Sequence, residues 1–156
     1  MLTLHHERGK NMKQLYKLIP LALLVGLAFT ALPAAGQGSI SVTITGIRSQ
    51  KGVIRCGIYS NPATFPAKAT RGFDRAINGS SVTCVFKGLA PGKYAIAANH
   101  DENKNGKTDT NLVGIPTEGW TVSNNVVPTL RAPRFNEALI NLKSGQNVRQ
   151  VLKLNY

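Results

Sequence analysis

Residues 39–47 read SISVTITGI and give a clear indication of the fold class. Its apolar residues Ile40, Val42 and Ile44 alternate with hydroxylated residues at a period of two, which is typical of a strand with one buried face. A second stretch, VIRCGIY at residues 53–59, alternates in the same way. The two stretches therefore predict strands of a β-sheet fold.

The same period recurs in the rest of the chain. We expect further strands at residues 82–87, 94–98, 138–142 and 148–154, and a short edge strand at 75–77. Turn-forming residues dominate the remainder of 60–79 and most of 99–137, so we expect loops there. About seven short strands without an amphipathic helix predict an all-β fold, an antiparallel β-sandwich.

The N-terminal part carries an export pattern. Residues 12–36 read MKQLYKLIPLALLVGLAFTALPAAG: two lysines, an apolar run and then small residues, which is typical of a secretory signal peptide. The apolar run has about 15 residues, fewer than the ~20 of a membrane-spanning helix. We expect residues 1–36 to be an extension plus a cleavable signal peptide. Residues 37–156 would then form one β-sandwich domain without a membrane span, exported to the periplasm or the medium.

The net charge and the numbers of cysteines and histidines restrict the partners and metal sites that we expect. The chain has 19 Lys and Arg against 7 Asp and Glu. Four of these basic residues and one acidic residue lie in residues 1–36, so the formal net charge of residues 37–156 is 15 − 6 = +9. The basic residues are dispersed and lack interleaved aromatics, so we expect no nucleic-acid partner. The basic residues either form a solvated surface without a partner, or they bind an anionic envelope glycan or another envelope protein. Two cysteines and three histidines exclude a multi-ligand Cys/His zinc site.

Cys56 and Cys84 both fall at inward positions of their predicted strands. An oxidising compartment favours a disulfide between them. Two separate buried thiols remain the alternative, because sequence does not show whether the two residues are within reach of each other.

The loop NHDENKNGKTDTN at residues 99–111 is the densest cluster of oxygen ligands in the chain. Its donors are the side chains of Asp101, Asn103, Asn105 and Asp109 and the backbone carbonyl of Lys107. The spacing D-x-N-x-N-G-x-x-D matches the first part of an EF-hand loop, so calcium is one hypothesis. Leu112 stands where that loop has its bidentate Glu, and the alternative is a metal-free turn in which Asx side chains bond the backbone.

Three further side chains are candidates for a site. His100 with Asp101 or Glu118 would supply the acid and base of a small cell-envelope hydrolase, but we find no nucleophile elbow, phosphate loop or paired-acid motif to join them. Trp120 is the only tryptophan and is either a stacking surface for a sugar or peptide or a cap on the sandwich. We therefore expect a non-enzymatic binding module in which His100, Glu118 and Trp120 belong to the binding surface.

Several motifs together point to a family. FKGLAPGKY at residues 86–94 resembles the G-L-x-P-G-x-Y turn of carboxypeptidase-regulatory-like and transthyretin-like β-sandwich domains. Continued through residues 100–111, GIPTEGW at 114–120 and SNN at 123–125, the chain is similar to the exported bacterial family called domain of unknown function 2141. The resemblance covers nearly all of residues 39–156. It implies a signal peptide and an immunoglobulin-like or prealbumin-like sandwich with no established activity, and it does not imply the cysteine pair.

Overall fold

The computed structural model describes residues 36–156 and folds them into eight strands. The strands are β1 Gly38–Thr45, β2 Val53–Tyr59, β3 Arg71–Ala76, β4 Val82–Leu89, β5 Gly92–Asp101, β6 Gly119–Val122, β7 Ile140–Leu142 and β8 Asn147–Lys153. Two short 3-10 helices, η1 Pro62–Thr64 and η2 Ser123–Asn125, interrupt the connections. The expected signal peptide lies outside the described residues, apart from Gly36.

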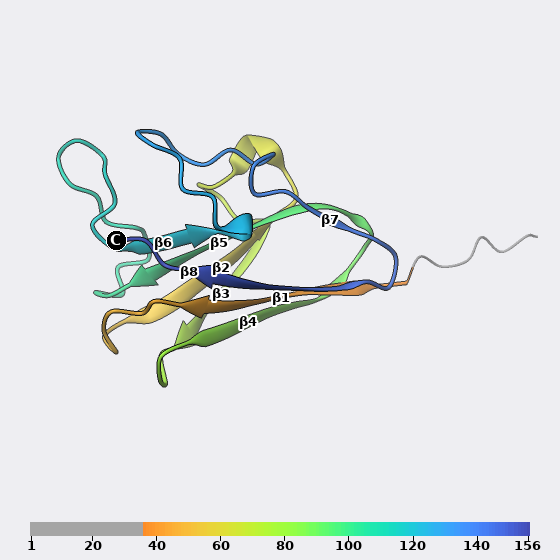
Figure 1. The fold of residues 1–156 in the computed structure, drawn as a ribbon, viewed down its shortest axis with the longest axis horizontal. Helices are drawn as coiled ribbons and strands as arrows, with labels where there is room; N and C mark the ends of the chain where they lie inside the picture. Colours follow the sequence, from red (N-terminus) through yellow and green to blue (C-terminus); the bar gives the residue numbers. More distant parts are fainter. Residues whose placement is uncertain (1–35) are drawn as a thin grey trace, which may run out of the picture. The chain divides into compact units, whose positions relative to one another are not determined.

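The strands form two sheets (Figure 1). One sheet has three strands in the order β4-β1-β8, and the other has the order β3-β2-β5-β6, with β7 paired to β5. This confirms the all-β expectation. One pairing departs from the predicted antiparallel pattern, since β1 and β8 run parallel. A parallel pair needs a long connection, and here almost the whole domain lies between its two strands.

The core lies between the two sheets and follows the alternation read in the sequence. Ile40, Val42 and Ile44 of β1 are fully buried and share one hydrophobic cluster with Ile54 and Ile58 of β2. Because β1 and β2 belong to different sheets, this cluster joins the two layers.

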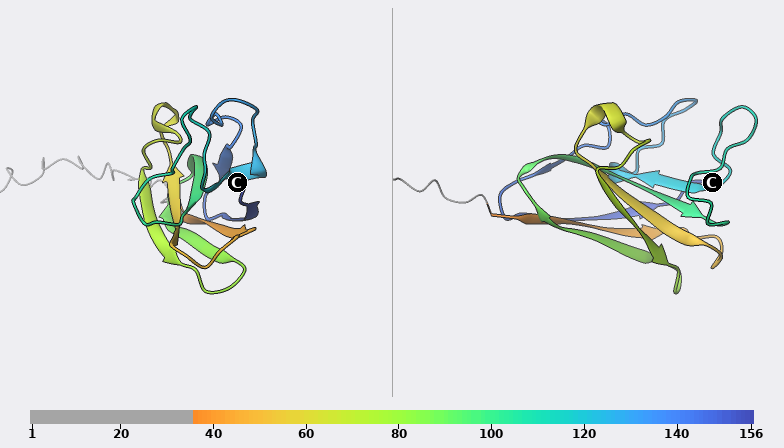
Figure 2. Two further views of the ribbon diagram at one scale, coloured as in Figure 1. Left: turned by 90° about the vertical axis from the view of Figure 1, so that its left-hand side faces the viewer. Right: turned by 180° about the vertical axis from the view of Figure 1, so that it is seen from behind.

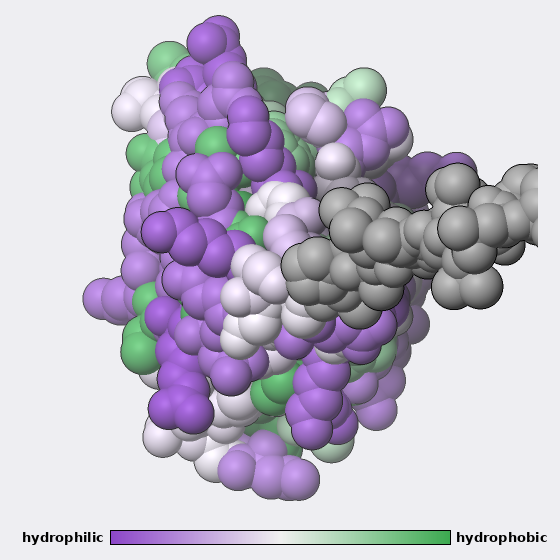
Figure 3. Space-filling view, turned by 90° about the vertical axis from the view of Figure 1, so that its right-hand side faces the viewer, coloured by the Kyte–Doolittle hydropathy of each residue, from purple (hydrophilic) through white to green (hydrophobic). Residues whose placement is uncertain are grey.

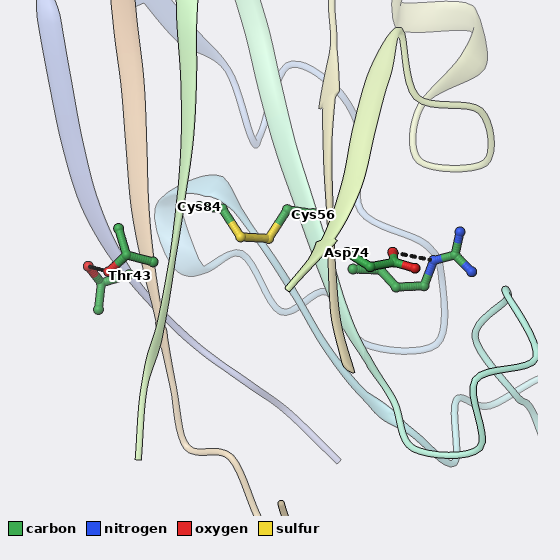
Figure 4. Close-up of a disulfide and its surroundings, with 6 residues drawn as sticks. Thr43, Cys56, Asp74 and Cys84 are labelled. Carbon is green, nitrogen blue, oxygen red and sulfur yellow. Dashed lines mark hydrogen bonds and ion pairs between the residues drawn. A yellow bond between two sulfur atoms is a disulfide. The ribbon is translucent and has the colours of Figure 1, made fainter. Parts of the chain in front are cut away.

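A disulfide also connects the two sheets (Figure 4). Cys56 of β2 is bonded to Cys84 of β4, with 6.5 Å between their Cα atoms. The predicted pairing is confirmed.

Two strands differ from the sequence expectation. The edge strand β3 begins at Arg71 rather than at residue 75, and almost all of its residues are exposed. This strand therefore shows no apolar alternation in the sequence, and it is recognised as a strand only by its antiparallel pairing with β2. The strand β6 lies in a segment expected to be loop, because four residues are too few to show a period.

A second hydrophobic cluster lies on the outer face of the five-stranded sheet. Its buried members are Tyr59, Ala95, Val122, Phe135 and Ala138. Three connections, residues 60–70, 102–118 and 126–138, project on this side of the sheet (Figures 1 and 2). Both clusters and the disulfide lie within residues 36–156, so this segment has hydrophobic cores of its own, which is the property that lets a domain fold alone. Within it, no helix is long and apolar enough to cross a membrane.

Candidate functional site

Two rows of side chains cross the outer face of the five-stranded sheet. Residues directly opposite each other on paired strands point to the same face. The register aligns four small residues in one row: Gly72, Gly57, Ala97 and Val122. The neighbouring row, two residues along each strand, is polar and aromatic: Asp74, Arg55, Asn99 and Trp120.

A groove of about 740 Å³ lies over these two rows, and all eight residues line it. Its walls come from the three projecting connections, through Ala69, Lys107 and Pro133 among others. The floor of the groove is lowest over the row of small residues, because their side chains rise little above the sheet. A Cβ atom on Gly57 would lie 3.0 Å from the Cβ of Ala69 and 3.2 Å from the Tyr59 ring, so the wall packs directly on this glycine.

The arginine of the polar row is already balanced by acids. Arg55 Nε lies 3.4 Å from Asp74 Oδ1, and its Nη1 lies 3.4 Å from Asp101 Oδ2. Figure 4 shows Asp74 on the opposite side of the sheet from the disulfide. With two carboxylates on one guanidinium, the floor of the groove has no uncompensated positive charge.

Beside this ion pair stands a hydrogen-bond donor without a protein acceptor. Asn99 Nδ2 is buried and has no hydrogen-bond partner within the described part of the chain. Its neighbour across the strands is Trp120, which is half-buried and lines the groove. Since an unpartnered buried donor is costly, the amide and the indole together favour a ligand that offers an oxygen acceptor and an apolar face.

The oxygen-rich loop comes together as expected, but its oxygens accept protein N–H groups. Asp101 Oδ1 and Oδ2 accept the backbone N–H groups of Asn105 and Gly106 at 3.0 and 2.9 Å. The two carboxylate oxygens of Asp109 accept the side-chain amides of Asn103 and Asn105, each at 2.7 Å. These bonds favour the metal-free turn, and the calcium hypothesis stays a prediction.

Glu118 and Lys107 are also part of this loop structure. The buried Glu118 carboxylate accepts the N–H groups of Glu102 at 2.8 Å and Asp109 at 3.0 Å, so it joins the two ends of the turn. The N–H of Lys107 donates to Asn105 Oδ1 at 3.0 Å. Among residues 36–156, no three His, Cys, Asp or Glu side chains converge as a metal site.

His100 lies on the other face of the sheet from Asp101, because neighbouring residues of a strand point to opposite sides. It is fully buried, and its Nε2–H donates to the carbonyl of Lys51 at 2.8 Å. In the neutral imidazole Nδ1 is then the acceptor, and it accepts from the Tyr156 hydroxyl, also at 2.8 Å. Burial raises the pKa of that phenol. The structure thus brings Trp120 to the groove, whereas His100 and Glu118 do not line it.

Sequence reasoning missed most of the groove. Arg55 occupies an outward position of a predicted strand, so the alternation does contain a signal for it. Asn99 lies just beyond the strand expected at residues 94–98, in a segment that we expected to be loop, whereas β5 continues to Asp101. The register that sets them beside Asp74 and Trp120 joins residues far apart in the chain, and no local pattern reports it.

The comparisons with known proteins agree with the resemblance seen in the sequence. A family model described as an uncharacterized protein conserved in bacteria, DUF2141, matches residues 42–150. Searches of curated proteins and of solved structures found no match. Because the match spans most of the two sheets, the chain belongs to the DUF2141 family.

Proposed function

We propose that this protein is an exported, non-enzymatic module of the bacterial cell envelope that binds a sugar unit in the groove. The observation that carries the proposal is the row formed by Asp74, Arg55, Asn99 and Trp120 beside a row of small residues. The proposal includes an immunoglobulin-like or prealbumin-like sandwich fold, which the two sheets with a core between them support. The export pattern at residues 12–36 supports the location.

The chemistry of a sugar ring fits this groove. A pyranose has an apolar C–H face, which stacks on an indole, and a rim of hydroxyls, which accept from an amide and donate to a carboxylate. The volume of about 740 Å³ lies inside the usual range of small-ligand sites. Because two acids already balance Arg55, a neutral sugar suits the floor better than an anionic one.

Catalysis has less support than binding. The polar row on the floor of the groove, Asp74, Arg55, Asn99 and Trp120, contains no nucleophile next to a base. His100 uses both ring nitrogens for internal hydrogen bonds. The alternative of a basic surface that binds anionic envelope glycans predicts affinity that salt removes.

The test is a titration of residues 36–156 with neutral hexose and N-acetylhexosamine oligomers, followed by Trp120 fluorescence and calorimetry. We expect binding that Trp120→Ala and Asn99→Ala each weaken by about tenfold or more, a loss of ~1.4 kcal/mol. Asn141→Ala, an exposed asparagine on β7, is the matched control and should bind normally.

Two results would reject the proposal. One is that none of these oligomers binds; the other is that binding survives both groove substitutions. Chromatography of a bound oligomer after long incubation tests the non-enzymatic part, since any hydrolysis product would contradict it.

A further inference from the structure

In the part of the chain that the structure describes, no connection covers the outer face of the three-stranded sheet. The three projecting connections lie on the other side of the molecule, over the five-stranded sheet (Figures 1 and 2). The alternation of β1 buries Ile40, Val42 and Ile44, so the residues between them point outwards. Figure 4 shows one of these, Thr43, on the side of the sheet away from the disulfide.

Acidic and basic residues are divided unevenly between the two sheets. None of the six acidic residues that follow the expected signal peptide lies in β4, β1 or β8. These strands carry three cations, Lys87, Arg149 and Lys153, which are exposed and form no salt bridge with the described residues. By contrast, the connections at residues 102–118 and 126–138 carry four acidic residues against four basic ones. The three-stranded sheet therefore carries positive charge only.

The strand register spreads the three cations along the outer face, although they are dispersed in the sequence. Each lies directly opposite an outward residue of β1: Lys87 opposite Ser39, Arg149 opposite Ser41, and Lys153 opposite Thr45. From the rise of a strand and the spacing between strands, the backbone of Arg149 lies about 12 Å from that of Lys87 and about 13 Å from that of Lys153. This spacing suits an extended ligand with repeated negative charges better than a single small anion.

Hydrogen-bonding groups lie between the cations. The outward residues of β1 are all hydroxylated: Ser39, Ser41, Thr43 and Thr45. Thr43 Oγ1 and Thr83 Oγ1 lie 3.2 Å apart and share one hydroxyl hydrogen, so the other hydrogen remains for a ligand. Ser39 Oγ donates to Asn147 Oδ1 at 2.6 Å, which leaves the amide hydrogens of Asn147. Hydrophilic residues cover most of the end of the domain where β1 begins (Figure 3).

We propose that the outer face of the three-stranded sheet binds a linear acidic polysaccharide. The carboxylates of the polymer pair with the three cations, and its hydroxyls exchange hydrogen bonds with the hydroxylated row of β1 and the amide of Asn147. The net charge of residues 37–156, 15 − 6 = +9, attracts the polymer to the domain. A lipid bilayer fits this face less well, because proteins that lie on a bilayer use an amphipathic helix or a lipid anchor, and these three strands supply neither. The surface is independent of the groove, which lies on the other sheet.

The test is a calorimetric titration of residues 36–156 with alginate, a linear polymer of uronic acids. We expect binding in dilute buffer that weakens by about tenfold or more when the salt concentration is raised to about 0.5 M, because salt screens exposed charges. A face variant that combines Lys87→Gln, Arg149→Gln and Lys153→Gln should also bind about tenfold or more weakly in dilute buffer, because three ion pairs are lost.

The matched control combines Lys68→Gln, Lys104→Gln and Arg134→Gln. These two lysines and one arginine are also exposed, and each lies in a different projecting connection. The control therefore has the same net charge as the face variant, and it should keep most of the affinity of the parent. Equal thermal midpoints of the variants show that folding is intact.

Three results would overturn the proposal. The first is that alginate does not bind in dilute buffer. The second is that both triple variants lose the same affinity, since binding would then follow the net charge of the domain rather than this face. The third is that phosphatidylcholine vesicles with about one third phosphatidylglycerol bind the parent more tightly than alginate does and fail to bind the face variant, because the cations would then serve a lipid surface.

Discussion

At the scale of single residues, His100 connects three parts of the chain. It lies at the end of β5, donates to the carbonyl of Lys51 between β1 and β2, and accepts from the hydroxyl of Tyr156 beyond β8. The Tyr156 hydroxyl also accepts the N–H of Arg48 at 3.2 Å. A buried imidazole with both nitrogens bonded is a structural connector, so its removal should affect stability.

We predict that His100→Phe lowers the free energy of unfolding by about 3 kcal/mol, because the Lys51 carbonyl and the Tyr156 hydroxyl lose their partner in a buried site. Urea unfolding measures the change. Tyr156→Phe, which removes one hydroxyl, should cost about 1 kcal/mol. A smaller effect for His100→Phe than for Tyr156→Phe would contradict this role.

From the hydrogen bonds in the Asp101 loop, we predict that calcium does not change the thermal stability of the domain. The loop oxygens already accept N–H groups, so the thermal midpoint of residues 36–156 should be the same in millimolar calcium and in chelator. Asp101→Ala should destabilise the domain by about 2 kcal/mol in both solutions. The N–H of Gly106 loses its acceptor, the N–H of Asn105 keeps only Asn103 Oδ1, and Arg55 loses one of its two carboxylate partners. A calcium-dependent rise that Asp101→Ala abolishes would instead establish the metal site.

At the scale of elements, the disulfide joins two strands that no backbone ladder connects. β2 lies in the five-stranded sheet and β4 in the three-stranded sheet. The connection from β6 to β7 is held by different interactions, the hydrogen bonds that the Glu137 carboxylate accepts from the Arg131 side chain and from the N–H of Arg134. We therefore expect the disulfide to make stability depend on its oxidation state, and the Glu137 hydrogen bonds to make the β6–β7 connection depend on pH.

We predict that replacing Cys56 and Cys84 together by Ala costs about 3–4 kcal/mol, the chain-entropy value for the 28-residue separation. Denaturant unfolding of the variant and of the reduced parent should give the same loss. A difference of less than about 1 kcal/mol between the oxidised and reduced parent would show that the cross-link does not stabilise the domain.

The connection at residues 126–138 should loosen in acid. Hydrogen bonds from Arg131 and from the N–H of Arg134 lower the pKa of Glu137 from 4.5 to about 2. Since the folded-state pKa is the lower one, the charged carboxylate favours the folded connection, and its contribution is full above pH 4.5 and lost as the pH falls through about 2. Limited proteolysis with an acid protease should cut this connection faster as the pH falls, and Glu137→Gln should remove most of that dependence.

At the scale of the whole molecule, the last two residues link the sheets. β8 belongs to the three-stranded sheet, but Asn155 pairs with Trp120 of β6 through backbone hydrogen bonds of 2.8 and 2.9 Å. The Tyr156 ring lies against Gly119, where an added Cβ would be 2.5 Å from its Cζ. The Trp120 end of the polar row under the groove is therefore supported by the end of the chain that follows β8.

We predict that deleting residues 155–156 increases hydrogen exchange at the Trp120 amide and weakens saccharide binding, while the core of β1 stays protected. Exchange measured by mass spectrometry or NMR tests both parts. Gly119→Ala should act in the same direction, because the new methyl group displaces the Tyr156 ring. Unchanged exchange at Trp120 in both variants would contradict the link.

The strands with an apolar alternation, the inward positions of Cys56 and Cys84 and the resemblance to the family can all be read from the amino-acid sequence. These features are local, because a period of two reports which side chains a strand buries. The four-residue β6 has no such period and was not predicted, and only the last two residues of the exposed strand β3 fall within the edge strand expected at residues 75–77. The two rows under the groove and the hydrogen bonds of His100 to Lys51 and Tyr156 depend on the tertiary structure. Strand register and packing between layers join residues that are distant in the chain, and no local pattern encodes those neighbours.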